Sequence, residues 1–209
     1  TTPISIISQI KDIQIIDTIP EFVDNSIDGA NRLSEDDEDL SGLRVEIELD
    51  GECLVIKDNC GGISRELAED YAFRFGRPEE INDQMESRIG EYGVGMKRSL
   101  FKLGKSFTIE SNPVEEYRFL IEIDVDEWES HDSWNFDAEI IYQTDPRCKL
   151  EEPGTRIEIT ELHEECKNEF QDEIFISKLK NKLVSRFNQY LQRDFQIILN
   201  KDPLGYTSI

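Results

Sequence analysis

The sequence predicts a two-layer α/β (α+β) sandwich, in which a mixed, mostly antiparallel sheet carries helices on one face. Strand patterns follow one another between residues 106 and 160, and successive strands of this kind favour antiparallel neighbours. Segments with helical apolar spacing lie before and after that run and can cover the sheet. The chain has 209 residues, so we expect one domain over residues 1–209.

The individual elements follow from apolar periodicity. Strands are expected at residues 43–50, 53–57, 106–110, 117–124, 136–142, 156–160 and 195–200. Helices are expected at residues 20–32, 65–73, 94–103 and 176–191. Residues 74–92 have little periodicity and much charge, and a long loop in a compact domain is often a lid. We therefore predict that residues 74–92 close over a bound ligand.

The composition restricts the partners of the domain. Its formal net charge is -23, from 46 acidic and 23 basic residues, and such a field repels nucleic acid. Direct nucleic-acid binding by this domain is therefore not expected. No transmembrane run or secretory signal is visible, and Cys53, Cys60, Cys148 and Cys166 lack metal-type spacing. A reduced, cytoplasmic setting is expected, or a nuclear one in a eukaryote.

The first candidate site segment is the expected helix at residues 20–32. At about 100° per residue, Glu21, Asn25 and Asp28 share one stripe, and the opposite side is apolar. A solvated helix face is the plain alternative. An asparagine in mid-helix is mildly unfavourable, however, and usually has a reason.

The second segment is the end of the expected strand at residues 53–57. Asp58 follows an apolar run and precedes a Gly61-Gly62 turn. A carboxylate there can accept a hydrogen bond from an exocyclic amine, and Gly62 would let the backbone approach a flat ring. An ordinary strand-ending turn is the alternative.

Two further segments contain glycine. Gly90, Gly93 and Gly95 run into an expected helix, whose N-terminal N–H groups favour an anion, and Lys97 adds a positive charge for a phosphate. The other segment is Gly154-Thr155, directly before the expected strand at residues 156–160. The hydroxyl of Thr155 could support Asp58 through a direct hydrogen bond or through a water. Each segment alone is a weak signal, whereas their order and spacing together indicate one nucleotide site.

Together these residues resemble the boxes of the GHKL ATPase family, which is named for gyrase, heat-shock chaperone, histidine kinase and MutL. The first box matches at Glu21, Asn25 and Asp28, and the third matches at its three glycines. In the second box, Cys60 replaces the first glycine. Residues 92–104 look most like the Microrchidia and MutL branches. The resemblance covers roughly residues 10–200 and implies a Bergerat-type ATP-binding fold.

The resemblance also implies the role of each matching residue, with ATP and Mg²⁺ as cofactors. Glu21 would be the general base for the attacking water. Asn25 would be the Mg²⁺ ligand, and Asp58 would read the adenine amine with support from Thr155. The other nucleotide-binding residues would be Asp28, Gly62, Ile63, Gly90, Gly93, Val94, Gly95, Met96 and Lys97.

Three functions remain open at this point. The first is an ATPase switch with slow hydrolysis, in which ATP binding promotes a homodimer. Residues 4–16 are a candidate docking segment for that dimer, with cover of the core as the alternative. The domain would then belong to a longer protein with C-terminal domains or a protein partner. The second is a histidine-kinase-like catalytic domain, which usually has Asn where Glu21 stands. The third is a nucleotide-binding sensor that never hydrolyses.

Overall fold

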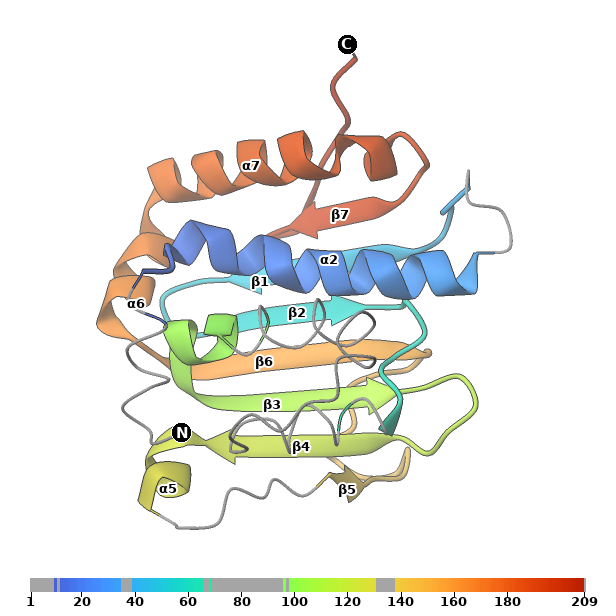
Figure 1. The fold of residues 1–209 in the computed structure, drawn as a ribbon, viewed down its shortest axis with the longest axis vertical. Coiled ribbons are helices and arrows are strands. Elements are labelled where there is room, and N and C mark those ends of the chain that lie inside the picture. Colours follow the sequence, from blue (N-terminus) through green and yellow to red (C-terminus); the bar gives the residue numbers. More distant parts are fainter. Residues whose placement is uncertain are drawn as a thin grey trace, which may run out of the picture.

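The computed structural model describes residues 10, 12–34, 39–65, 68, 96, 98–130 and 138–208. Within these residues the strands form one eight-stranded sheet in the order β5-β4-β3-β6-β2-β1-β7-β8 (Figure 1). The strands are β1 (Arg44–Leu49), β2 (Leu54–Asp58), β3 (Gly104–Asn112), β4 (Phe119–Asp124), β5 (Glu139–Ile140), β6 (Gly154–Leu162), β7 (Gln196–Leu199) and β8 (Asp202–Pro203). The β1–β7 pair is parallel and the other pairs are antiparallel, so the prediction of a mixed, mostly antiparallel sheet is confirmed.

The sheet buries one face beneath helices. Along β1, Val45, Ile47 and Leu49 are buried, whereas Glu46 and Glu48 on the other face are not. The helices are α2 (Ile15–Leu33), α5 (Val125–Ser130), α6 (Glu164–Gln171) and α7 (Glu173–Leu191), and Met96 and residues 98–103 are also helical. Helices α2 and α7 lie along the same face (Figure 1). This arrangement confirms the predicted two-layer sandwich.

Helix α2 begins earlier than the sequence predicts. The helix was expected to begin at Pro20. In the structure Pro20 lies inside the helix, which begins at Ile15. Ile15 and Ile19 are 5% and 0% exposed. We infer that burial of these side chains outweighs the loss of one helical hydrogen bond at the proline.

Helix α7 begins at Glu173, three residues before its expected start, because the Asp172 carboxylate accepts a hydrogen bond from the Ile174 N–H at 2.9 Å. Helix α6 was not predicted. Its buried residues are Cys166 and Phe170 alone, so its apolar stripe is too sparse to be recognised in the sequence. Helix α5 was also not predicted, because its six residues are too few to show a helical repeat.

Several expected elements fall wholly or partly outside the described residues. The expected strand at 136–142 is reduced to Glu139–Ile140 among its described residues. Arg65 and Ala68 are helical, but the rest of the expected helix 65–73 is not described. The predicted lid at 74–92 lies entirely outside. In the part of the chain that is described, no helix is long and apolar enough to cross a membrane.

Candidate functional site

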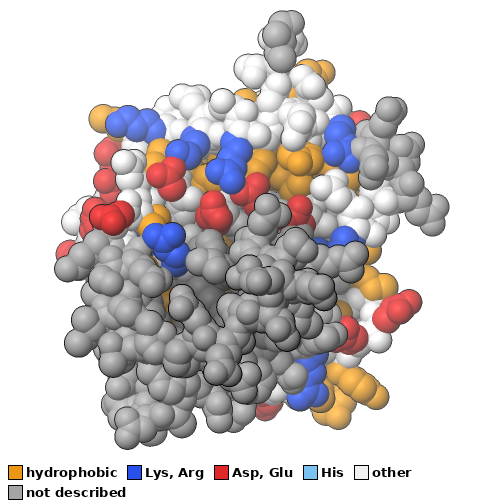
Figure 2. All heavy atoms as spheres, viewed as in Figure 1, with side chains coloured by type: hydrophobic (Ala, Val, Ile, Leu, Met, Phe, Trp, Pro, Cys, Tyr) orange, Lys and Arg blue, Asp and Glu red, His pale blue; other side chains and the backbone are white. Residues whose placement is uncertain are grey.

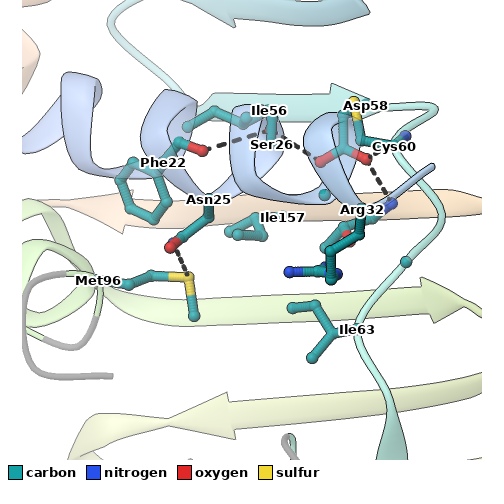
Figure 3. A pocket seen from close by; sticks show the side chains of 13 residues that line it. Phe22, Asn25, Ser26, Arg32, Ile56, Asp58, Cys60, Ile63, Met96 and Ile157 are labelled. Atoms are coloured by element: carbon teal, nitrogen blue, oxygen red, sulfur yellow. Dashed lines mark hydrogen bonds between the residues drawn. The ribbon is translucent and has the colours of Figure 1, made fainter. Parts of the chain in front are cut away.

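One side of α2 forms a wall of a pocket between this helix and the sheet (Figure 3). The α2 residues that line it are Phe22, Asn25, Ser26, Gly29 and Arg32. Their spacing of three, four, seven and ten residues from Phe22 places them on one helical stripe. The empty volume is about 480 Å³, including the part open to solvent.

The opposite wall comes from the sheet and the segment after β2. Its residues are Ile56, Asp58, Cys60, Gly62, Ile63 and Ile157, with Thr155 at the start of β6 and Met96 at one end. The lining therefore combines apolar side chains with several polar groups. Such a surface suits a flat ring that carries a small number of hydrogen-bonding groups.

Asp58 is the main polar group of the pocket, and it is only 8% exposed. Its Oδ1 atom accepts hydrogen bonds from the Cys60 N–H at 2.9 Å and the Thr155 N–H at 3.1 Å. Its Oδ2 atom accepts one from the Ser26 hydroxyl at 2.8 Å. A carboxylate has roughly four acceptor positions, so one position on Oδ2 remains for a ligand.

These surroundings affect the ionisation of Asp58 in two directions. Burial raises its pKa above the ordinary value of 3.8. The three hydrogen bonds and the positive charge of Arg32 oppose that effect, because each favours the ionised form. Burial also raises the pKa of the neighbouring Cys60 thiol, and the charge of Asp58 raises it further, so this thiol stays protonated.

Two glycines let α2 and β6 approach the turn that holds Asp58. A Cβ atom on Gly29 would lie 2.5 Å from the Cys60 carbonyl oxygen. A Cβ atom on Gly154 would lie 2.0 Å from the Asp58 carbonyl oxygen. Both contacts are far inside van der Waals distance. The glycines therefore allow the close packing that brings Ser26 and Thr155 to the carboxylate.

Asn25 lies at the other end of the pocket, beside Met96. Its amide nitrogen donates to the Met96 Sδ atom at 3.3 Å (Figure 3). This contact orients the side-chain amide and leaves its oxygen as an acceptor or metal ligand. An amide oxygen is a suitable ligand for Mg²⁺, so Asn25 fits the role that the first box implies. Among the described residues, no group of three or more His, Cys, Asp or Glu side chains could hold a metal ion.

Comparison with family models places this site in a known group of proteins. Residues 14–155 match the model described as histidine kinase-, DNA gyrase B-, and HSP90-like ATPase. The match covers more than half of the chain. The chain belongs to this ATPase family. A comparison with curated proteins found no match.

Membership of this family supports ATP binding as the general function of the domain. Of the residues predicted for the site, the structure brings Asn25, Asp58, Gly62, Ile63, Met96 and Thr155 together around one pocket. The contact of Thr155 differs from the expected one, because its backbone N–H donates to Asp58, where the sequence suggested its hydroxyl. Outside the described residues lie Gly90, Gly93, Val94, Gly95 and Lys97.

Glu21 and Asp28 are not among the pocket-lining residues. Both are half-buried on α2, and the Oε1 atom of Glu21 is 3.7 Å from Nη2 of Arg186 on α7. The same guanidinium pairs with Asp24. Burial raises the pKa of Asp24, Arg186 opposes this shift, and Glu21 and Asp28 add to it. Glu21, the predicted general base, is therefore part of an ion-pair group between α2 and α7.

Figure 2 shows this arrangement, with basic side chains above acidic ones where α7 meets α2. Lys182 on α7 pairs with Asp17 on α2 in the same way. The sequence alone suggested that the acidic stripe of α2 was a ligand-binding face. The structure shows that Glu21 of this stripe lies beside Arg186 of α7, which is more than 150 residues away in the chain.

Sequence reasoning missed Ser26 and Arg32 as pocket residues. Ser26 carried a signal, because it is a polar residue on the side of α2 that also holds Phe22 and Val23. Buried hydroxyls need a partner, and here the partner is Asp58. Arg32 carried no such signal, because a basic residue in the last turn of a helix is ordinary.

Proposed function

We propose that this domain binds ATP with Mg²⁺ and hydrolyses it slowly, as a conformational or dimerisation switch of a larger protein. The observation that carries the proposal is the acceptor left on Asp58. Three donors of the protein hold this carboxylate in place, and the carboxylate lines the pocket with one acceptor position left. The exocyclic amine of adenine supplies the matching donor.

The base and the phosphates occupy opposite ends of the site in this proposal. Gly62 and Ile63 line the adenine ring beside Asp58, and Met96 lies at the phosphate end together with Asn25. The phosphate cradle is completed by Gly90, Gly93, Val94, Gly95 and Lys97. Backbone N–H groups at the start of a helix, with a nearby lysine, suit a polyphosphate.

Asn25 contributes its side-chain oxygen to Mg²⁺. Magnesium retains several waters and needs few protein ligands, so one amide together with the phosphates is sufficient. When bound, the ion neutralises phosphate charge. The hydrogen bond from the Asn25 amide nitrogen to Met96 fixes which side-chain atom is presented.

Glu21 is the general base in this proposal and orients the attacking water. Its ion pair with Arg186 directs the carboxylate toward α7, so turnover requires release or reorientation of this carboxylate. Slow hydrolysis is consistent with that requirement.

The contact between Glu21 and Arg186 also favours a second candidate, a nucleotide-binding module that does not hydrolyse ATP. In that case the acid serves only to join α2 and α7. Turnover by a Glu21→Ala variant separates the two functions. Binding of ATP without turnover supports Glu21 as the base, whereas equal turnover in variant and wild type removes it from the mechanism.

The test of the proposed site is calorimetry of ATP binding, with and without Mg²⁺. Wild type is compared with Asp58→Asn, which removes the acceptor, and with Asn25→Ala, which removes the magnesium ligand. We expect Asp58→Asn to weaken binding sharply and Asn25→Ala to abolish its magnesium dependence. Exposed Asp50→Asn, in the turn between β1 and β2, is the matched control and should bind like wild type.

The switch function is tested by oligomeric state and proteolysis. Light scattering with a non-hydrolysable ATP analogue should detect a dimer that the apo protein lacks. Cleavage at residues 74–92 should slow when ATP is bound, because this segment is the proposed lid. Equal cleavage with and without nucleotide would remove the lid from the proposal.

A further inference from the structure

Arg32 is a charged residue on the wall of the pocket. Among the described residues that line the pocket, only Arg32 and Asp58 carry a charge. The Arg32 backbone belongs to the last turn of α2, and its side chain extends into the pocket on the side of Ile63 (Figure 3).

The position of Arg32 along α2 assigns it to one end of the pocket. It follows Asn25 by seven residues, which at 1.5 Å per residue is about 10 Å along the helix axis. It follows Gly29 by one turn, and Gly29 abuts the Cys60 carbonyl next to Asp58. Arg32 therefore lies at the Asp58 end and away from the Asn25 end.

We propose that Arg32 contacts the nucleotide base, with its planar guanidinium group lying against a face of the purine ring. This inference rests on the proposed function, in which Asp58 binds the exocyclic amine at the edge of the same ring. A guanidinium group stacks on aromatic faces. Arg32 lines the pocket while remaining exposed to solvent, so a bound ring can reach its guanidinium group.

The charge of Arg32 also serves Asp58. Arg32 is among the groups that favour the ionised form of this buried carboxylate. The ionised form accepts the hydrogen bond from the base. Arg32 therefore contacts the face of the ring directly and favours the hydrogen bond that Asp58 makes at its edge. A neutral residue at this position would provide neither effect.

The experiment compares ATP with adenosine, which has the same base and no phosphate. Calorimetry is performed on wild type, Arg32→Gln, which removes the charge, and Arg32→Lys, which retains the charge but loses the plane. We expect Arg32→Gln to weaken both ligands by a similar factor of roughly 2- to 30-fold. Arg32→Lys should recover little of the loss, because a lysine does not present a flat group.

Arg193→Gln is the matched control. Its guanidinium contacts Asn31 at 3.4 Å, so it removes a positive charge from the same end of α2 without lining the pocket. It should leave the adenosine affinity unchanged. Thermal unfolding of each unliganded variant verifies that the fold is kept.

The following results would overturn the assignment of Arg32. Weaker ATP binding with unchanged adenosine binding would place its contact at the phosphates. Unchanged binding of both ligands would show that Arg32 does not contact the nucleotide. Failure of wild type to bind either ligand would overturn the proposed function as well, and a normal affinity in Asp58→Asn would show that the base lies elsewhere.

Discussion

The two ends of α2 contrast in how they hold their charged groups. Near its C-terminal end, Asp58 is 8% exposed and accepts three hydrogen bonds of 2.8–3.1 Å from the protein. Toward its N-terminal end, Glu21 and Arg186 are 37% and 46% exposed and lie 3.7 Å apart. The first arrangement is fixed by sheet and turn geometry, whereas the second depends on long side chains in contact with solvent.

This difference indicates that the two ends of α2 have different tasks. A buried carboxylate whose orientation is fixed by hydrogen bonds is suited to binding one ligand group with little rearrangement. An exposed ion pair contributes little to stability and is easily exchanged for another partner. We infer that the Asp58 end is preformed for recognition and that the Glu21 end is adjustable. The following predictions test this contrast, in order of expected effect.

The largest effect is expected for Gly154→Ala. The new Cβ atom would lie 2.0 Å from the Asp58 carbonyl oxygen, so β6 or the Asp58 turn must shift. We expect a loss of about 3 kcal/mol in the free energy of unfolding, measured by urea denaturation. The control is Gly205→Ala, whose Cβ atom would meet nothing within 4 Å. Equal stability of the two variants would contradict the preformed Asp58 end.

The second effect is on the pH dependence of adenosine binding. Protonation of Asp58 places a proton on the acceptor that the base requires. Adenosine affinity should therefore fall by about tenfold per pH unit below the pKa of Asp58 in the folded protein. Because burial raises that pKa above 3.8, the fall begins at higher pH than for an exposed aspartate. The charge of Arg32 and the hydrogen bond from the Cys60 N–H oppose this rise.

Stability should respond to pH with the opposite sign. A raised pKa means that the folded protein holds the proton of Asp58 more tightly than the unfolded chain does. The contribution of Asp58 to stability is therefore greatest at low pH and declines as the pH rises from 3.8 through the folded pKa. Urea denaturation of wild type and Asp58→Asn at several pH values measures this difference, which should disappear if Asp58 were solvated.

A smaller effect is expected for Ser26→Ala, which removes one of the three donors to Asp58. Hydrogen bonds to charged groups contribute about 1.5–3 kcal/mol, and we expect a loss near the lower figure in unfolding free energy. ATP affinity should also fall, because the carboxylate is less firmly oriented. The control is Ser41→Ala, whose hydroxyl binds the exposed Asp39 and should change stability by less than about 0.5 kcal/mol.

The smallest stability effect is expected for Arg186→Ala at the adjustable end. Exposed ion pairs contribute about 0.2–1 kcal/mol, and salt screens them, so the loss should shrink further at high ionic strength. Arg186→Lys preserves the charge and is the matched variant. The ATP turnover rate of Arg186→Ala should change more than its ATP affinity, because Glu21 is proposed to act in hydrolysis rather than in binding. An affinity loss equal to that of Asp58→Asn would remove the distinction between the two ends.

Features that depend on local order could be predicted from the residues alone. The alternation in β1, the apolar side of α2 and the position of Asp58 at the end of β2 follow from side-chain periodicity, which neighbouring residues specify. The spacing of the boxes likewise predicted the family that residues 14–155 match. The two-layer sandwich was also predictable, since the strand order along the chain favours antiparallel neighbours.

Contacts between side chains that are far apart in the chain could not be predicted in this way. Ser26 reaches Asp58 over 32 residues, Thr155 reaches it over 97, and Arg186 pairs with the acids of α2 over more than 160. Glycine at position 154 is required because two backbones approach there, which no local pattern reveals. Helix α6 and the early start of α2 depend similarly on burial against distant elements. The physical reason is that burial and pairing are properties of packed neighbours, whereas periodicity is a property of the chain itself.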